Sequence, residues 1–488
     1  MSNEGMSKKK LAGIIAACVI VAIVVIVLVT SHPWRPPISP PMYSLSVDIS
    51  PSGAGSVSLS PAGGQYNPDA QVTLRASPAS GYRFVNWTGD VGTVADVNSA
   101  SVVISMNDDY YITANFALEV VEIRDWYDLD AVRDNLGGSY LLMNDLDSTI
   151  AGYMELAGNT ANEGMGWEPI GTSGDGFTGS FDGQGYEIRD LFINRPDQDY
   201  VGLFAHVSWI HPIENVGAIE NVGVVNADVT GYSRVGALVG YSSGIVNNSY
   251  SIRGATSGWT YVGGLVGYGH GGFVSNSHSA GNVSGFRYVG GLVGGITGTR
   301  AVREGTVIDC YSTTSVTGFT RTGGLVGSIV GDGNVSGCYF AGSVDGTRWV
   351  AGLVAENEGG TVSNSYSTGN VTGRDYSGYV GGAVGFNLWG TISNCYSTSI
   401  INGKTPVGGL VGDNSEGTVN DSLWDIQTSG QTASDGGTGK PTTEMKSIAT
   451  FTGAGWNIVA VANPDIANPS YVWNIVDGQT YPFLSWQS

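Results

Sequence analysis

Short apolar runs broken by glycines recur along residues 200–426, with polar stretches between them. The run Val262–Gly267 reads Val-Gly-Gly-Leu-Val-Gly and returns unchanged as Val289–Gly294. Looser copies lie 27 to 34 residues apart when counted from the first of them, and they begin at Val201, Val235, Thr322, Val350, Val380 and Val407. A near-constant period in this range predicts a stacked-repeat architecture.

Each repeat also carries a second segment, of the form apolar-x-Asn-Ser/Cys-Tyr-Ser with some variation. It occurs at Val246–Ser251, Val274–Ser279, Val307–Ser312, Val335–Phe340, Val362–Ser367 and Ile392–Ser397. Short strands joined by glycine corners, with one coil per period, predict a right-handed parallel β-solenoid (β-helix) over residues 200–426. About eight coils spaced by about 4.8 Å would make a rod about 40 Å long.

The Gly-Gly-Leu-Val-Gly core of the repeat resembles the GLUG motif of repeat-containing surface proteins. This resemblance implies a structural or adhesive rod on a cell surface.

A strict alternation of polar and apolar residues marks residues 43–117 and predicts a small all-β domain. The alternation is clear in Tyr43–Ile49, Gln71–Ala76 and Ser101–Ile104. With Gly81–Phe84, Trp87–Gly89 and Thr113–Phe116, this stretch resembles the divergent internalin-type B-repeat domain of surface proteins. The resemblance implies a spacer or adhesion-associated module without catalytic residues.

Residues 118–199 are expected to form the entry or cap region of the solenoid, and they resemble the opening coils of pectin-lyase-like β-helices. Leu129–Leu136 has a helical pattern, and strands are predicted at Tyr140–Met143, Phe177–Phe181 and Leu191–Ile193. Beyond the repeats, residues 427–488 form a loop and an aromatic-rich tail. We expect this tail to cover the last open edge of the solenoid.

The N-terminus combines a basic segment with a long apolar run. Residues 1–10 end in three lysines, and residues 11–30 carry no charge over 20 positions, about 30 Å of helix. This pattern predicts a cytoplasmic tail, a single transmembrane anchor and an extracellular C-terminal region. A cleaved signal peptide is the competing interpretation. Residues 31–42 contain five prolines and predict a stiff linker.

Composition narrows the possible partners. The formal net charge is −21 and only 13% of residues are charged, so the surface repels phosphates and nucleic-acid binding is not expected. Cys310, Cys338 and Cys395 occupy one repeat position that holds serine in other copies. We interpret them as small, half-buried residues; a Cys310–Cys338 bridge between neighbouring coils is the less favoured alternative.

No catalytic, metal-binding or cofactor-binding residues are predicted. The five histidines do not form the His-Glu-x-x-His pattern of zinc metallopeptidases, and Gly436–Lys440 lacks the glycine spacing of a phosphate-binding loop. Carboxylates such as Asp309, Asp332 and Glu356 do not share a repeat position, so no pair for polysaccharide cleavage can be proposed.

Aromatic residues do share repeat positions, in two sets. The first set follows the closing glycine of each repeat, and the second precedes the Val-Gly-Gly-Leu-Val-Gly run; their members are Tyr232, Trp259, Phe286 and Phe319, then Tyr261, Tyr288, Trp349 and Tyr379. Arginines 234, 287, 321 and 348 lie among them. Such columns either stabilise adjacent coils by packing or form a platform for sugar rings or a protein partner.

The sequence therefore predicts a mainly β, membrane-anchored cell-surface protein. It would present a repeat rod for glycan or protein binding and would not be an enzyme. The alternative is a carbohydrate-active β-helix enzyme, a polysaccharide lyase or hydrolase.

Overall fold

The computed structural model of the chain describes residues 41–79, 81–210, 215–298, 304–374, 378–404 and 406–487. The chain divides into two compact units, one ending at Ala117 and the other running from Leu118 to Ser488. The predicted tail and membrane anchor, and all of the linker except its last two residues, lie outside the described residues. Within the described ranges, no helix is long and apolar enough to cross a membrane.

The first unit is all-β, as predicted. Its described strands form two sheets with the orders β3-β1-β7-β5 and β2-β4-β6. They are β1 (Tyr43–Ser50), β2 (Gly55–Ser60), β3 (Gln65–Tyr66), β4 (Ala70–Pro78), β5 (Tyr82–Gly89), β6 (Ser101–Met106) and β7 (Tyr110–Leu118). Trp87 and Phe116 pack in the core between them. The three strands predicted from alternation are confirmed as β1, β4 and β6.

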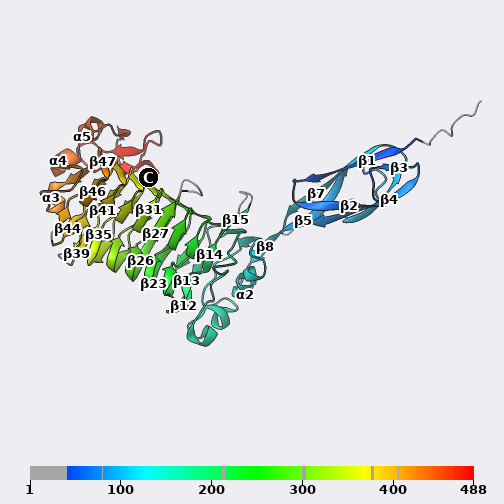
Figure 1. Cartoon of the computed structure of the whole chain (residues 1–488), viewed down its shortest axis with the longest axis horizontal. Coiled ribbons are helices and arrows are strands. Elements are labelled where there is room, and N and C mark those ends of the chain that lie inside the picture. Colours follow the sequence, from blue (N-terminus) through cyan, green and yellow to red (C-terminus); the bar gives the residue numbers. More distant parts are fainter. Residues whose placement is uncertain are drawn as a thin grey trace, which may run out of the picture. The chain divides into compact units, whose positions relative to one another are not determined.

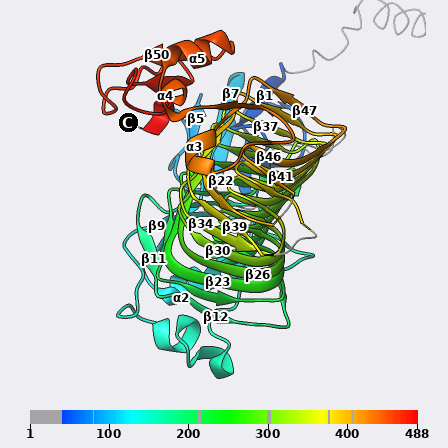
Figure 2. The same cartoon turned by 90° about the vertical axis from the view of Figure 1, so that its left-hand side faces the viewer.

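Most of the second unit is a stack of coils whose strands pair in parallel across three large sheets (Figures 1 and 2). Within the described residues, one sheet has 11 strands: β8 (Val120–Ile123), β9 (Ser139–Leu142), β10 (Ser180–Asp182), β17 (Ala218–Glu220), β22 (Ile245–Asn247), β25 (Phe273–Ser275), β28 (Thr306–Ile308), β32 (Asn334–Ser336), β37 (Thr361–Ser363), β42 (Thr391–Ser393) and β47 (Thr418–Asn420). A second has eight described strands: β14 (Phe204–Val207), β21 (Val239–Ser242), β24 (Val266–His270), β27 (Val293–Gly298), β31 (Val326–Gly331), β36 (Val354–Glu358), β41 (Val384–Leu388) and β46 (Val411–Ser415).

The third sheet has 21 strands in the described part of the chain. They include β13 (Asp199–Val201), β18 (Gly223–Val225), β19 (Asp228–Thr230), β20 (Ser233–Val235), β23 (Tyr250–Gly263), β26 (His278–Gly290), β29 (Tyr311–Ser312), β30 (Ser315–Gly323), β33 (Tyr339–Phe340), β35 (Arg348–Ala351), β38 (Tyr366–Ser367), β40 (Val380–Gly381), β43 (Tyr396–Ser397), β48 (Leu423–Asp425) and β49 (Thr438–Lys440). Strands of successive repeats pair in parallel in all three sheets, which is the arrangement of a parallel β-helix.

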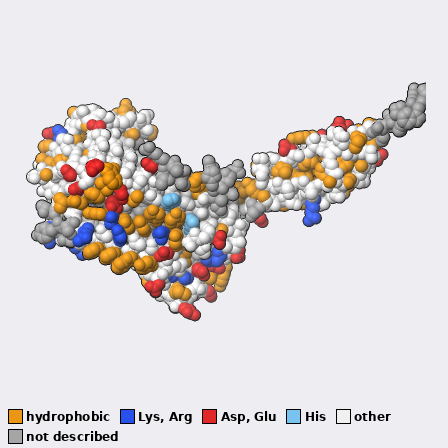
Figure 3. Space-filling model, in the orientation of Figure 1, with side chains coloured by type: hydrophobic (Ala, Val, Ile, Leu, Met, Phe, Trp, Pro, Cys, Tyr) orange, Lys and Arg blue, Asp and Glu red, His pale blue; other side chains and the backbone are white. Residues whose placement is uncertain are grey.

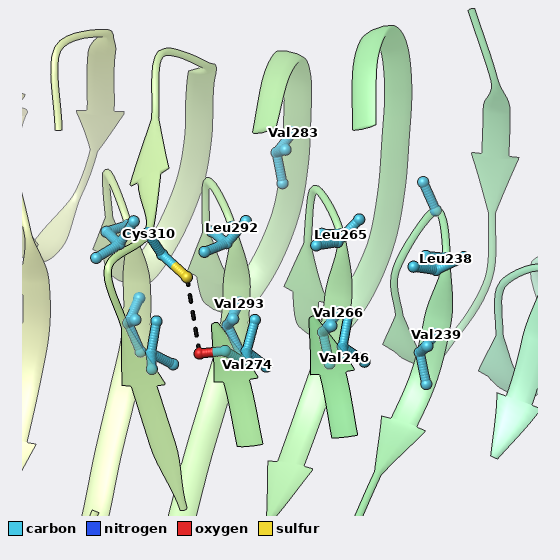
Figure 4. Packing of buried hydrophobic residues seen from close by; sticks show 14 of the residues in the cluster. Leu238, Val239, Val246, Leu265, Val266, Val274, Val283, Leu292, Val293 and Cys310 are labelled. Atoms are coloured by element: carbon cyan, nitrogen blue, oxygen red, sulfur yellow. Dashed lines mark hydrogen bonds between the residues drawn. The ribbon is translucent and has the colours of Figure 1, made fainter. Parts of the chain in front are cut away.

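The Val-Gly-Gly-Leu-Val-Gly run forms the corner between the 21-stranded and the eight-stranded sheets. Val262, Leu265 and Val266 are fully buried, and the same residues of neighbouring coils stack on them (Figure 4). The glycines are required by close approach, because a Cβ on Gly263 would lie 2.0 Å from the Val266 carbonyl oxygen. Glycines 263, 264 and 267 do not adopt left-handed backbone angles.

The cysteine column is fully buried, which corrects the half-buried interpretation. Cys310, Cys338 and Cys395 are 0% exposed and carry free thiols. The Cys310 thiol contacts the Ile308 carbonyl oxygen at 3.1 Å and the Val274 carbonyl oxygen at 3.7 Å (Figure 4). Serine makes the equivalent bond in other coils, for example from Ser277 to the Ser275 carbonyl oxygen at 2.6 Å. The two residue types are therefore interchangeable at this position, as predicted.

The asparagine of the second recurring segment sits in a left-handed turn. Asn248, Asn276, Asn364 and Asn394 all have φ between 47° and 51°. In other coils Asp309, Gly337 and Asp421 take the same place with φ of 53°, 64° and 48°. Asn, Asp and Gly are the residues that tolerate this conformation best.

The predicted helix at Leu129–Leu136 is displaced and shortened. Helix α2 spans Trp126–Asp130 and continues as a 3-10 turn over Ala131–Asp134. The Asp125 carboxylate caps α2 by accepting from the backbone N–H groups of Tyr127 and Asp128. This cap sets the start three residues earlier than the apolar pattern indicated.

The C-terminal segment covers more than the open edge. Residues 433–440 lie on the last coil, where β49 pairs with β48 and the Gly409 amide donates to the Ala433 carbonyl oxygen. The aromatic tail beyond them folds back along one side of the solenoid (Figure 2), and the Trp486 indole N–H donates to the Gly337 carbonyl oxygen at 3.1 Å. The expectation that the aromatic tail would cover the last edge is corrected accordingly.

Candidate binding face

The second predicted aromatic set forms a column on the 21-stranded sheet. In each coil its residue lies just before the Val-Gly-Gly-Leu-Val-Gly corner. Strand register places residues of seven successive coils at one position, which we call the corner column: Tyr200, Arg234, Tyr261, Tyr288, Arg321, Trp349 and Tyr379. The first six have φ between 52° and 61°. A left-handed backbone costs a non-glycine residue about 1–2 kcal/mol. Residues with bulky side chains are therefore unusual at such a position.

The rings and guanidinium groups of the corner column stack on one another. The Tyr261 and Tyr288 rings lie parallel, 4.5 Å apart. The Arg321 guanidinium lies between two rings, 4.9 Å from the centre of Tyr288 and 3.9 Å from the centre of Trp349. Arg234 covers the Tyr200 ring at 4.9 Å. These are cation–π distances. Arginine and aromatic residues therefore stack in two runs, one of Tyr200 with Arg234 and one from Tyr261 to Trp349.

The first predicted set also forms a column, called here the outer column: Tyr232, Trp259, Phe286 and Phe319. Trp259 and Phe286 stack at 4.1 Å, and Phe286 and Phe319 at 4.8 Å. Tyr232, Trp259 and Phe319 remain 46%, 48% and 42% exposed. Phe286 is therefore stacked on both faces, while Tyr232, Trp259 and Phe319 keep a large part of their surface in water.

A third column, missed in the sequence, faces the corner column from the eight-stranded sheet. This flank column contains His206, Tyr241, Tyr268, Gly295, Ser328, Glu356, Phe386 and Asp413. Tyr268 meets Tyr261 edge to face at 4.6 Å, and Phe386 lies 5.3 Å from both Trp349 and Tyr379. Its sequence signal is the residue one place after the Val-Gly-Gly-Leu-Val-Gly run, which is Tyr, Phe or a polar residue in every copy of the run from Val235 onward except that of Gly295.

One arginine of this face has a buried carboxylate partner. Arg321 Nε donates to a Glu356 carboxylate oxygen at 2.6 Å, and the Ser328 hydroxyl donates to the same oxygen at 2.8 Å. Arg287 and Arg348 lie one position before the corner column, since they pair with Thr260 and Thr320. In Figure 3, hydrophobic and basic side chains lie side by side over the 21-stranded and eight-stranded sheets, with histidine beside them.

A hollow of about 440 Å³ opens at the N-terminal end of this face. Its walls include Tyr200, His206, Arg234, Tyr241, Tyr268 and His270. The Tyr261 hydroxyl next to it has a pKa raised to about 12 by burial and by the neighbouring Tyr288. Burial also raises the pKa values of Tyr241 and Tyr268 and lowers the pKa of His206. These four groups are therefore uncharged near neutral pH.

A fourth column lies on another side of the solenoid and was not singled out in the sequence, although its residues belong to the recurring Asn-Ser/Cys-Tyr segment. This side column stacks Tyr250, His278, Tyr311, Tyr339, Tyr366 and Tyr396 at 4.6 to 5.1 Å. The C-terminal tail covers part of it: Trp486 stacks on Tyr339, and the Tyr396 hydroxyl donates to the Pro482 carbonyl oxygen at 2.6 Å. The covered part is therefore a packing surface.

Across the described ranges, no three His, Cys, Asp or Glu side chains converge on a point where they could hold a metal ion.

These features define a parallel β-helix with an open aromatic and basic face, preceded by a small β domain. Residues 45–119 match the divergent InlB B-repeat domain, which confirms the resemblance seen in the sequence of the first unit.

Two curated relatives match part of the chain. Halomucin of Haloquadratum walsbyi is 35% identical over 133 residues, which is 27% of this chain and 1% of halomucin. A protein described as a Gly-rich membrane protein of Evansella cellulosilytica is 37% identical over 125 residues, which is 25% of this chain and 13% of that protein. The chain spans a small fraction of either relative.

Two solved structures are similar in outline. A crystal structure assigned as an immunoglobulin A1 protease from Bacteroides ovatus has a TM-score of 0.43 and 20% identity, covering 75% of this chain and 92% of that one. An IgA1 protease has a TM-score of 0.39 and 15% identity, covering 79% of this chain and 29% of that one.

Proposed function

We propose that this protein is a cell-surface rod, anchored in the membrane through residues 11–30, whose solenoid binds glycan chains along the corner and outer columns. The coils would wind in the right-handed sense and belong to the GLUG type. Support comes from the B-repeat domain and from partial similarity to halomucin and to a protein described as a membrane protein.

The observation that carries the proposal is the backbone of the corner column. Six successive coils place Tyr, Arg or Trp in a left-handed conformation, although Asn or Gly would reduce the backbone cost there. The side column packs equally well without left-handed backbone at its Tyr positions. Packing alone therefore does not explain the residues at the corner, and strain of this kind often marks a functional surface.

The shape of the face fits an extended ligand. The outer column keeps nearly half of each of three aromatic side chains exposed, and the corner column beside it is half-buried. Sugar rings have apolar faces that can lie on aromatic rings, and the arginines between the rings can donate hydrogen bonds to hydroxyl groups. A polymer lying along the coils would meet a similar surface at each step.

The direct test is glycan-array binding of the full-length chain and of two variants, Trp259→Ala and Tyr288→Ala. Each should weaken binding by about tenfold, since loss of one stacking contact costs about 1–1.5 kcal/mol. Trp389→Ala is a matched control, because Trp389 is 59% exposed and also left-handed at 53° but lies outside all four columns. Unchanged binding by both column variants would sink the proposal.

The enzyme alternative predicts a different result. Incubation of the full-length chain with the bound polysaccharides would then release unsaturated or reducing ends. We propose that no ends are released, because Glu356, a carboxylate of the flank column, is already bound by Arg321 and Ser328.

A further inference from the structure

The corner column contains two arginines, Arg234 and Arg321. They differ in the carboxylate that neutralises the guanidinium charge. Arg321 has a buried partner, since Glu356 comes from the flank column and lies 2.6 Å from Arg321 Nε. The solenoid thus shows where a carboxylate binds an arginine of this column: in the groove between the corner and flank columns, with an aromatic ring on either side of the guanidinium.

Arg234 has the same place in its coil but no such partner. Its neighbours in the flank column are Tyr241 and Tyr268, which supply no carboxylate. Apart from the Tyr200 ring, it contacts the Ser233 hydroxyl through a weak hydrogen bond from Nη1 at 3.3 Å and Asp199 through an ion pair at 3.6 Å. Its Nε is buried and makes no hydrogen bond. Asp199 is itself 45% exposed, so this ion pair is open to water and weak.

The space beside Arg234 is the hollow described above, and its described walls contain no Asp or Glu. Tyr200, Tyr241 and Tyr268 provide aromatic surface around it. His206 Nδ1 lies 3.2 Å from the Thr172 carbonyl oxygen. Because a carbonyl oxygen only accepts, Nδ1 carries the proton and Nε2 of the neutral ring is left to accept from a ligand hydroxyl.

Resting on the proposed function, we infer that this hollow is the acidic-sugar subsite of the face. It binds the carboxylate of a hexuronic acid unit on Arg234, while the sugar ring lies against the tyrosines. The carboxylate of the ligand forms with Arg234 the ion pair that Glu356 forms with Arg321. The glycan is therefore a uronic-acid-containing polysaccharide, bound by the full face and oriented at this end.

The experiment compares alginate, polygalacturonate and hyaluronan with their carboxyl-reduced, neutral forms, by affinity electrophoresis of the full-length chain. At least one acidic polymer should bind more tightly than its reduced form, by about tenfold at low salt, with the difference shrinking as salt rises. Arg234→Gln should abolish the difference. Arg234→Lys should restore part of it, because lysine keeps the charge without the planar fork.

Asp199→Asn gives a readout that misfolding cannot mimic. It removes the carboxylate that competes for Arg234, so it should raise affinity for the acidic polymer about two- to threefold. Arg253→Gln is the control: Arg253 has a left-handed backbone at 60°, as Arg234 has at 57°, but it is exposed and lies outside the face.

The outcomes separate the two proposals. Equal binding of acidic and reduced polymers, or no effect of Arg234→Gln and Asp199→Asn, overturns the acidic-sugar subsite. If Trp259→Ala still weakens binding in that case, the glycan-binding face stands. If no polymer of this set binds, the acidic-sugar subsite is overturned, and the glycan array alone decides the glycan-binding face.

Discussion

At six successive corners of the solenoid, a left-handed residue and the glycines that follow it turn the chain together. The glycines of the repeated run were expected to supply the turn, and they do permit close contact between coils. The left-handed residue, however, is the Tyr, Arg or Trp that precedes the run. A conformation that Asn or Gly would occupy more easily cannot be inferred from a tyrosine, so the strain at this position was visible only in the structure.

The single histidine of the side column makes stability depend on pH. His278 is stacked between Tyr250 and Tyr311, and burial lowers its pKa. His278 therefore binds a proton more readily in the unfolded chain than in the folded protein. The free energy of unfolding consequently falls as pH drops below about 6.5. Above that value the effect is absent.

We predict that His278→Tyr removes part of this pH dependence and extends the tyrosine stack without a break. The urea midpoint of the variant should equal or exceed that of the wild type at pH 7 and should fall less between pH 7 and 5.5. Some dependence remains, since burial also lowers the pKa of His206. Identical pH profiles would contradict the assignment of the effect to His278.

At the scale of elements, the period alone predicted the coil and most of its strands. The two aromatic sets could be found by counting repeat positions. That Tyr241 and Tyr268 face this column could not be found in this way, because they lie on a different sheet and meet Tyr200 and Tyr261 only across a corner. The sequence states which residues share a position but not which positions face each other, and that depends on the cross-section of the coil.

A buried asparagine column ties the last coils together. Asn357 Nδ2 donates to Asn387 Oδ1 at 2.8 Å, and Asn387 Nδ2 donates to Asn414 Oδ1 at 2.6 Å. Each side chain also donates to a carbonyl oxygen three residues on, at 3.1 Å. The column links three strands of the eight-stranded sheet on its inner side.

We predict that Asn387→Ala destabilises the solenoid by about 2–4 kcal/mol, because it removes three bonds and leaves buried partners unsatisfied. Asn402→Ala, at an exposed strand end, should change stability by less than about 0.5 kcal/mol. Urea unfolding followed by tryptophan fluorescence measures both. If Asn387→Ala lowers the free energy of unfolding no more than Asn402→Ala does, water replaces the hydrogen bonds of the column and the prediction is wrong.

At the scale of the whole molecule, the solenoid is a chain of nearest-neighbour contacts. Each coil pairs with the one before and the one after, and residue 261 stands over residue 288 in register. Such a stack is expected to stay folded when one whole coil is removed, but not when part of a coil is removed.

We predict that deleting residues 261–287, one complete coil, leaves a folded and shorter solenoid. The circular dichroism spectrum should stay strand-rich and the thermal midpoint should fall by a few degrees. Deleting residues 261–274 instead breaks the register of all three sheets and should give an insoluble or unfolded product. Equal behaviour of the two deletions would contradict the coil-by-coil account.

The coil spacing also sets how binding strength would grow. Every added coil extends the aromatic face by about 4.8 Å and brings another weak contact within reach of a polymer that is already held. Successive contacts of this kind are intramolecular, and their avidity rises steeply with number even when each is feeble. The residence time of the polymer would then depend on the number of repeats. Duplication or loss of one coil would change that time without altering any single contact.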